Sequence, residues 1–137
     1  MASRLNPYIQ FDGNARAAME FYQGVFGGDV ASNTFKEFGA SHGPDDDDKL
    51  MHSQLETPSG FTLMASDTPQ GMTYNPGENI AISLSGDGDE LRGYYEKLSE
   101  GGKVSVPLEK QMWGDEFGQC TDKFGVSWLV NIGQVCG

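Results

Sequence analysis

The sequence predicts an α+β fold with two tandem βαβββ modules, because its 137 residues contain the same order of predicted elements twice. A strand followed by an amphipathic helix begins near Asn6, and a second such segment begins at Asn79. Three strands then follow each helix, and the last two strands of each half align with each other without a gap. This matching order indicates an internal duplication.

The first aligned segments are NPYIQFDGNARAAMEFYQGVFGG and NIAISLSGDGDELRGYYEKLSEGG. In both, apolar residues recur every three or four positions after the strand, which is typical of a helix with one buried face. Asn14 in the first copy, and Asp87 or Asp89 in the second, are predicted N-caps. The glycine pairs 27–28 and 101–102 are expected to end the helices with positive φ.

The second aligned segments, MHSQLETPSGFTLMASD and EFGQCTDKFGVSWLVNI, each predict a hairpin closed by a short polar turn, TPSG or DKFG. Strand patterns have a period of two residues, and they set the expected boundaries. We expect strands near 5–11, 29–38, 50–57, 61–66, 79–85, 103–112, 115–121 and 126–132, with helices near 14–26 and 88–100.

These elements predict two antiparallel sheets, each backed by one helix. Their other faces would be free to curl around a central cavity, forming one mixed or antiparallel sheet. We expect a single domain over residues 1–137, with module one at about 1–70 and module two at about 77–137.

The composition excludes several classes of partner. A formal net charge of −11 repels the phosphates of nucleic acids and of anionic lipids, so neither is expected to bind. No apolar run approaches the length of a transmembrane helix, and the N-terminus lacks the apolar stretch of a secretory signal, so a cytoplasmic location is expected. Cys120 and Cys136 form no CxxC pair, which favours two idle thiols over a disulfide.

The segments NPYIQFDGNARAAMEFYQGVFGG, MHSQLE, LMASD and MWGDEFGQCTDKFGVSWLVNI carry a resemblance to a known superfamily. The chain resembles vicinal oxygen chelate proteins, which include glyoxalase I, extradiol dioxygenases and bleomycin or fosfomycin resistance proteins. More narrowly, it is similar to the PhnB-like branch of bacterial proteins, most of which have no assigned reaction. The resemblance implies paired modules and a homodimer, but one such fold hosts many chemistries.

The resemblance also implies where metal-dependent members place four ligands, on the first and last strands of each module. Carried over, these positions are Met64, Leu129, Asn79 and the segment 6–8. Methionine and leucine offer no oxygen or nitrogen, and an asparagine amide is a weak ligand for a transition metal. We therefore expect no metal ion and no cofactor, and metal-dependent glyoxalase or dioxygenase activity is the least favoured function.

PhnB-like sequences sometimes carry a ubiquinone-methyltransferase label, but SGDGDE lacks the GxGxxG spacing, and no Rossmann site for S-adenosylmethionine is expected.

His52, Gln54 and Glu56 share one face of their predicted strand, because alternate residues of a strand point the same way. Three roles stay open for His52: a hydrogen-bonded residue in a polar pocket, a ligand contact, or a residue that acts as a general acid–base or binds a metal. The preceding DDDDK run, like His42, is expected in a solvated loop. If that loop is flexible, enteropeptidase should cut after Lys49.

Aromatic side chains on strands that border the predicted cavity suggest a pocket for a small molecule. Trp113 and Phe117 are expected to line it, whereas Trp128 is expected either there or in the interior. We expect a metal-free protein that binds a cationic or aromatic small molecule. The alternatives are an isomerase or lyase with His52 as acid/base, and a structural or regulatory dimer with a vestigial cavity. The predicted ligand-binding residues are Tyr8, Gln10, His52, Gln54, Trp113, Phe117 and Trp128.

Overall fold

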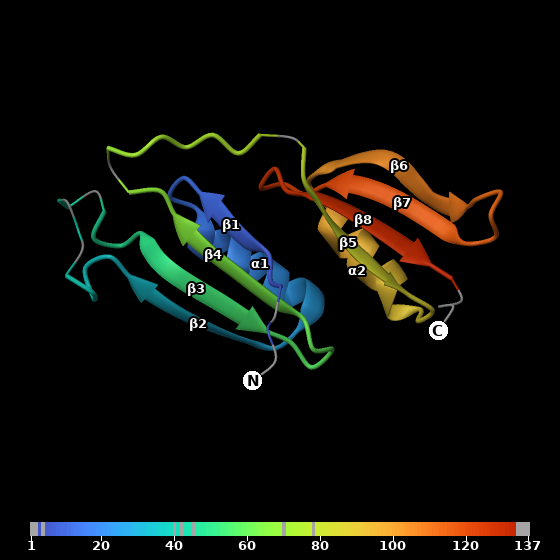
Figure 1. The fold of residues 1–137 in the computed structure, drawn as a ribbon, viewed down its shortest axis with the longest axis horizontal. Helices are drawn as coiled ribbons and strands as arrows, with labels where there is room; N and C mark the ends of the chain where they lie inside the picture. The colour runs from blue at the N-terminus through green and yellow to red at the C-terminus, as the bar shows by residue number, and fades with distance from the viewer. Residues whose placement is uncertain are drawn as a thin grey trace. The chain divides into compact units, whose positions relative to one another are not determined.

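The computed structural model describes residues 3, 5–39, 41, 43–44, 46–69, 71–77 and 79–133, so His42 and Cys136 lie outside the described residues. The chain divides into two compact units, Met1–Pro76 and Gly77–Gly137. In each unit one helix lies across one face of a four-stranded sheet (Figure 1). Within the described part of the chain, no helix is long and apolar enough to cross a membrane.

The first unit contains five elements, and its sheet has the strand order β1-β4-β3-β2. Strand β1 runs parallel to β4, whereas the β3–β4 and β2–β3 pairs are antiparallel. The elements are β1 (Tyr8–Phe11), α1 (Ala15–Phe26), β2 (Asp29–Thr34), β3 (Leu50–Glu56) and β4 (Thr62–Asp67).

The second unit repeats this topology, with the strand order β5-β8-β7-β6. Strand β5 is parallel to β8, and the other two pairs are antiparallel. The elements are β5 (Ala81–Gly86), α2 (Glu90–Ser99), β6 (Lys103–Lys110), β7 (Glu116–Thr121) and β8 (Ser127–Ile132).

The prediction of two purely antiparallel sheets is therefore wrong at one pair in each unit, and the mixed form of the predicted fold class is confirmed. The three strands after each helix alternate in direction because short connections join them. In each unit the helix connects the first strand to the other three strands. Such a crossover allows the first strand to lie parallel to the last strand. The predicted element order is confirmed.

The two hairpin turns have the same geometry, which supports the duplication. Gly60 N–H donates to the Thr57 carbonyl at 3.0 Å, and Gly125 N–H donates to the Asp122 carbonyl at 3.0 Å. The φ angles of Gly60 and Gly125 are 88° and 90°, a region that L side chains rarely adopt. The turns TPSG and DKFG are thus equivalent in backbone conformation as well as in sequence position.

The glycine pairs that follow the helices serve two purposes. The first glycine of each pair has a φ of 76°, as predicted. The second glycine allows a close backbone approach: a Cβ on Gly28 would lie 2.1 Å from the Glu56 carbonyl oxygen. A Cβ on Gly102 would lie 2.1 Å from the carbonyl oxygen of Thr121. Gly102 has no positive φ, so the predicted reason for this glycine is wrong and crowding explains it.

Each unit has its own hydrophobic core between helix and sheet. In the first unit Tyr22 and Met19 of α1 are almost fully buried with Phe11 and Leu55 of the sheet. Burial of each such side chain contributes about 1.5–3 kcal/mol to folding. The core of the second unit is formed by buried residues of α2 and of the strand faces that pack against it. The helix contributes Leu91, Tyr95 and Leu98, and the strands contribute Leu84, Cys120, Trp128, Val130 and Ile132.

A carboxylate at the end of β4, rather than the predicted N-cap, begins α1. Asn14 occupies the cap position but makes no side-chain capping bond. Instead Oδ1 of Asp67, which is 2% exposed, accepts hydrogen bonds from the backbone N–H groups of Gly13 and Ala15, both at 2.9 Å. Oδ2 accepts the N–H of Leu50 at 2.9 Å. Asp67 therefore joins the start of α1 to the start of β3. In α2, Asp89 is likewise at the cap position without a capping bond.

The first aspartate of the DDDDK run, Asp45, lies outside the described residues, and the part of the run that the structure describes is less solvated than expected. Asp46 is fully buried, and its carboxylate lies 3.2 Å from Lys49 Nζ. Lys49 Nζ also donates to the Thr68 carbonyl at 3.3 Å, and Asp47 accepts a hydrogen bond from Ser41 Oγ at 2.6 Å. The expectation of a solvated run is wrong for Asp46, because a local turn brings its own lysine onto it.

Candidate functional site

The open face of the first sheet carries four of the predicted site residues. In the sheet register Tyr8 lies opposite Met64, and Met64 lies opposite Gln54, so these side chains share one face. Gln10 and His52 are two residues along their strands from Tyr8 and Gln54 and therefore lie on the same face. Ser53 and Leu55 are buried on the other face, toward α1. The predicted polar stripe on β3 is thus present.

A groove of about 360 Å³ lies over β2 and β3 on this unit. The ring of Tyr8 lies beside it, with its centroid 6.1 Å from that of His52 and an interplanar angle of 35°. Gln54 Nε2 donates to Glu56 Oε1 at 2.9 Å, which orients the amide along the strand. The groove is lined by Asp29, Val30, Ala31, Asn33, His52, Gln54 and Glu56.

The groove concentrates hydrogen-bonding groups and negative charge. Asp29 lies directly opposite Glu56 across the β2–β3 pair, and Asn33 lies opposite His52. Like charges in directly opposite positions destabilise a sheet, and a cation between them would offset that cost. None of the described lining residues is a lysine or arginine. The surface is therefore suited to a ligand that has hydrogen-bond donors and positive charge.

Strand β2 supplies groove residues that the sequence analysis did not single out. Asp29, Ala31 and Asn33 alternate along β2 and lie opposite Glu56, Gln54 and His52. The alternating side chains of β2 could have indicated which of its residues share a face. Only the register of β2 against β3 shows that Asn33 lies opposite His52. The sequence analysis also did not single out Asp67, whose carboxylate binds backbone amides and has a structural role.

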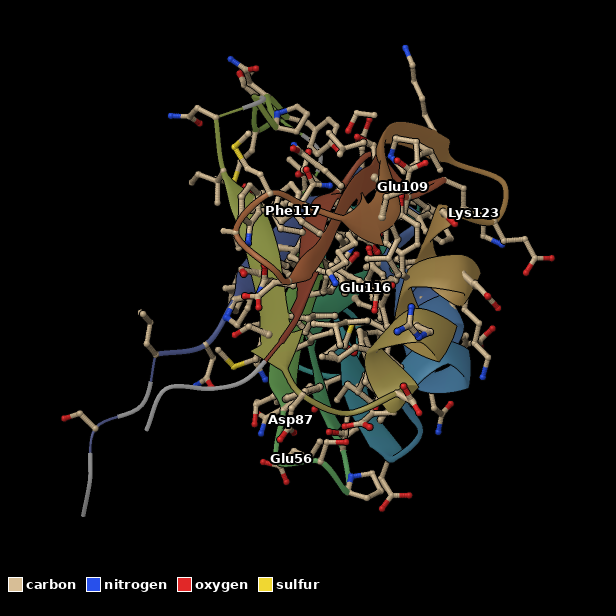
Figure 2. All side chains as sticks on the ribbon, turned by 90° about the vertical axis from the view of Figure 1, so that its right-hand side faces the viewer. Glu56, Asp87, Glu109, Glu116, Phe117 and Lys123 are labelled. Atoms are coloured by element: carbon tan, nitrogen blue, oxygen red, sulfur yellow. The ribbon has the colours of Figure 1, made fainter. Side chains whose placement is uncertain are left out.

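The remaining predicted residues lie in the second unit and fall into two groups. Trp113, in the connection between β6 and β7, is 59% exposed, and its ring lies edge-on to that of Phe117 with centroids 6.1 Å apart. Figure 2 shows Phe117 on the side of the sheet away from α2, whereas its neighbour Glu116 lies on the α2 side. Trp113 and Phe117 form an accessible aromatic pair on the open face of the second sheet.

Trp128 is a core residue. It is 1% exposed, and its Nε1–H donates to Asp122 Oδ2 at 2.9 Å. Asp122 Oδ1 also accepts the backbone N–H groups of Phe124 and Val126 at 2.8 and 3.1 Å, so one carboxylate fixes both the DKFG turn and the indole. This placement agrees with the interior-filling alternative, because an indole that is 1% exposed offers almost no surface to a ligand.

Cys120 has no catalytic setting. It is fully buried on the helix side of β7, and burial together with the neighbouring Asp122 charge raises the pKa of its thiol to about 11. Such a thiol stays protonated at neutral pH and is a poor nucleophile.

The strand positions that the resemblance implies for metal ligands carry side chains that are poor ligands for a transition metal. Met64 and Leu129 offer a thioether and a hydrocarbon, and the residues paired with Met64 on either side are Tyr8 and Gln54. Over the described ranges no group of three or more His, Cys, Asp or Glu side chains could share an ion.

The two junctions between the first strand and the helix of each unit do not fit S-adenosylmethionine or another cofactor with a nucleoside group. At the first junction the amides of Gly13 and Ala15 already bind Asp67. At the second, the carboxylate of Glu90 folds over Gly88, since a Cβ on that glycine would lie 2.0 Å from Glu90 Oε2. Neither junction presents the free glycine backbone that cradles such a group.

Comparison with known proteins identifies the family. Residues 3–131 match the sequence model of a family described as 3-demethylubiquinone-9 3-methyltransferase. The chain belongs to this PhnB-like family. A solved structure from Pseudomonas aeruginosa, protein PA1353, is 38% identical and has a TM-score of 0.81, with 97% of this chain and 99% of that chain covered.

Two further solved structures place the PhnB-like chain in its fold group. A protein from Bacillus cereus titled putative 3-demethylubiquinone-9 3-methyltransferase, PhnB protein, is 23% identical with a TM-score of 0.73 over 96% of this chain and all of the other. A glyoxylase/bleomycin resistance protein/dioxygenase domain from Frankia is 13% identical with a TM-score of 0.65 over all of this chain and 96% of the other. The fold is that of the vicinal oxygen chelate superfamily, as the resemblance implied.

Proposed function

We propose that the protein binds a small organic molecule on the open face of its first sheet, without a resident metal ion. The groove of His52, Gln54 and Asn33 beside the Tyr8 ring carries this proposal. Its volume of about 360 Å³ is in the range of small-molecule sites, and polar groups from two strands converge there. The ligand is held by stacking and hydrogen bonds, so no catalytic group is needed.

The chemistry of the groove favours a planar cation. The carboxylates of Asp29 and Glu56 lie opposite each other at one end of the paired strands. The exposed ring of Tyr8 offers a face on which a planar or cationic group can stack. The net charge of −11 raises the local concentration of cations and speeds their association.

Thermal-shift titration with an aromatic cation tests the binding. The probes are the cationic acridine dye proflavine, a neutral acridine and an aromatic carboxylate of similar size. A ligand at about 100 times its dissociation constant adds about 2.7 kcal/mol of stability. For a chain of this size the melting temperature should rise by roughly 8–12 °C. Equal shifts with the neutral and anionic probes would contradict the proposed ligand class.

Two variants locate the binding site. Tyr8→Ala should weaken proflavine binding by about tenfold through the loss of stacking. Phe38→Ala is the matched control, because Phe38 is 54% exposed and Tyr8 is 52% exposed. His52→Ala should weaken binding as well. Unchanged affinity in both groove variants would refute the site.

The absence of a resident metal is tested by metal analysis of purified protein. The fit of Met64 and Leu129 to a metal is poor, so transition metals should be well below one equivalent. One equivalent that survives dialysis would instead support a metal-dependent glyoxalase or dioxygenase.

An enzymatic function is the second candidate, because His52 lies where a general acid–base could act. The imidazole is half-buried, with the Tyr8 ring on one side and Gln54 on its own strand. An isomerase or lyase could use His52 for proton transfer, with Tyr8 or Gln54 as hydrogen-bond donors. Loss of turnover of a substrate in His52→Ala, with binding of that substrate retained, would favour this function.

We further propose that the chain forms a homodimer, as the resemblance implies. Light scattering after gel filtration should give twice the 14.9 kDa chain mass. A monomer that binds proflavine would refute the dimer while leaving the binding site intact. A dimer that binds none of the probes would favour a structural or regulatory protein.

A further inference from the structure

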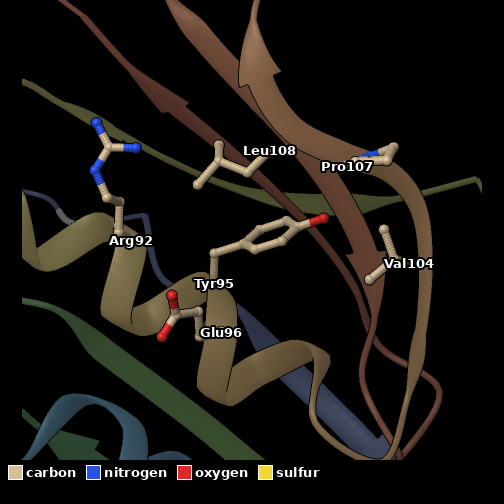
Figure 3. A pocket seen from close by; sticks show the side chains of 6 residues that line it. All are labelled: Arg92, Tyr95, Glu96, Val104, Pro107 and Leu108. Carbon is tan, nitrogen blue, oxygen red and sulfur yellow. The ribbon is translucent and has the colours of Figure 1, made fainter.

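A second cavity lies in the other unit, on the helix side of the second sheet. Its volume is about 330 Å³, and it opens between α2 and the edge strand β6. Figure 3 shows the Tyr95 ring between the helix and β6, with Val104 and Pro107 near its hydroxyl end and Leu108 toward Arg92. The lining residues are Arg92, Tyr95, Glu96, Val104, Pro107 and Leu108.

The cavity depends on two local irregularities. Strand β6 shifts its register against β7 on both sides of Val106, so the strand departs from the sheet near Pro107. Below it, Gly118 leaves room for the Tyr95 ring, since a Cβ there would lie 2.7 Å from Tyr95 Cε1. The Tyr95 hydroxyl donates a hydrogen bond of 2.8 Å to the backbone carbonyl of Val106, the residue at which the register of β6 shifts. The ring is therefore a fixed apolar floor.

The charges at the cavity are unequal. Arg92 makes a bidentate ion pair with Glu116, donating through Nη1 and Nη2, and its Nε lies 3.7 Å from Asp89. Its positive charge is thus compensated. Glu96 lies one helical turn after Arg92 on the same face of α2, and within the described residues its carboxylate has no ion pair. The uncompensated charge at the cavity is therefore negative.

We propose that this cavity is a binding site for a small hydrophobic amine, with the ammonium group at Glu96 and the apolar body on Tyr95, Val104 and Leu108. Glu96 carries the uncompensated negative charge and so sets the position of the ammonium group, whereas the paired guanidinium of Arg92 gives it no net attraction or repulsion. Pro107 and Val104 provide apolar contact without hydrogen-bonding side chains. A simple anion is disfavoured, because Glu96 repels it and Glu116 already occupies the Arg92 guanidinium.

The phenol supports this arrangement by staying neutral. Burial raises the pKa of Tyr95, so its hydroxyl remains protonated and continues to donate to Val106. A neutral ring adds no negative charge that would compete with Glu96 for the ammonium group.

The test is an NMR titration of the ¹⁵N-labelled full chain with 2-phenylethylamine. An open cavity and a ligand of this size give a dissociation constant on the order of 1 mM. The amide shifts should saturate and should be centred on α2 and β6. The matched probes 2-phenylethanol and 3-phenylpropionate should bind more weakly, in that order, and shifts centred instead on His52 and Gln54 would overturn this site.

Three variants make the proposal falsifiable. Glu96→Gln should weaken binding about threefold or more, as expected for loss of an exposed ion pair. Glu100→Gln, one turn further and outside the cavity, removes the same charge and should leave binding unchanged. Val104→Trp should fill the cavity and abolish binding, while the spectrum reports whether the fold is intact. Equal affinities in wild type and Glu96→Gln, or no saturable shift up to about 20 mM, would overturn the proposal. Because the groove at His52 lies in the other unit, either site can fail alone.

Discussion

Asp67→Ala should be the most destabilising single truncation of a polar side chain in the first unit. The carboxylate is 2% exposed and accepts three backbone hydrogen bonds at 2.9 Å, from Gly13, Ala15 and Leu50. Removing it leaves three amides without an acceptor at a site that water reaches poorly. The start of α1 and the start of β3 then lose their common anchor.

The expected loss in the free energy of unfolding follows from those three hydrogen bonds. A hydrogen bond to a charged group contributes about 1.5–3 kcal/mol, and loss of a helix N-cap alone costs about 0.5–2 kcal/mol. The bonds share one carboxylate and water can partly replace it, so their contributions are not additive. We expect a loss of about 3–5 kcal/mol, a large part of the roughly 5–15 kcal/mol that stabilises a typical domain.

Urea unfolding followed by circular dichroism measures this loss. With an m value of about 2 kcal/mol/M, the midpoint should fall by roughly 1.5–2.5 M. Asp67→Asn is an informative intermediate, because its one carbonyl oxygen can still accept the α1 amides while its NH₂ group faces the Leu50 N–H. Asp12→Ala is the control, since Asp12 is exposed in the same connection and should change stability by less than about 0.5 kcal/mol.

The reasoning would be refuted if Asp67→Ala lost less than about 1 kcal/mol with an unchanged m value. It would also be refuted if Asp12→Ala cost as much as Asp67→Ala, because the effect would then reflect charge near α1 rather than the three bonds.

Three further predictions concern the loop, the ion pair and the second cavity. Enteropeptidase should cut the native chain after Lys49 only slowly, because Asp46 is buried against that lysine. Arg92 lowers the pKa of Glu116 below its usual 4.5, so the pair contributes stability above that pH and loses it as the pH falls through the lowered value. An NMR titration should show Glu116 titrating below 4.5 in wild type and closer to 4.5 in Arg92→Met. Gly118→Ala should destabilise by about 1–3 kcal/mol in urea unfolding, because its Cβ would overlap the Tyr95 ring.

Each of these has an outcome that contradicts it. Cleavage of the native chain as fast as of the urea-unfolded chain would show that the loop is open. An unchanged Glu116 titration in Arg92→Met would remove the ion pair as the cause of the pKa shift. Gly24→Ala is the control for Gly118→Ala, because a Cβ on Gly24 meets no atom within 4 Å and should not destabilise α1.

The sequence by itself determined the order of elements and the faces of most strands. Apolar periodicity depends only on which side chains avoid water, so it located both helices and the polar stripe that begins at His52. The turns TPSG and DKFG were recognisable because their glycines are needed for positive φ, a local property of the chain. The resemblance added the family, which the match over residues 3–131 confirms.

Tertiary structure decided what depends on partners distant in sequence. The parallel pairing of β1 with β4 required the α1 crossover, and the register of β2 with β3 brought Asn33 to His52. Asp67 replaces Asn14 as the acceptor at the start of α1 across a separation that no local pattern encodes. Alternation assigns the residues of a strand to two faces, but only the packing of a helix against one face decides which face is the core. In the second unit α2 packs against the face of β8 that carries Trp128, which is therefore buried.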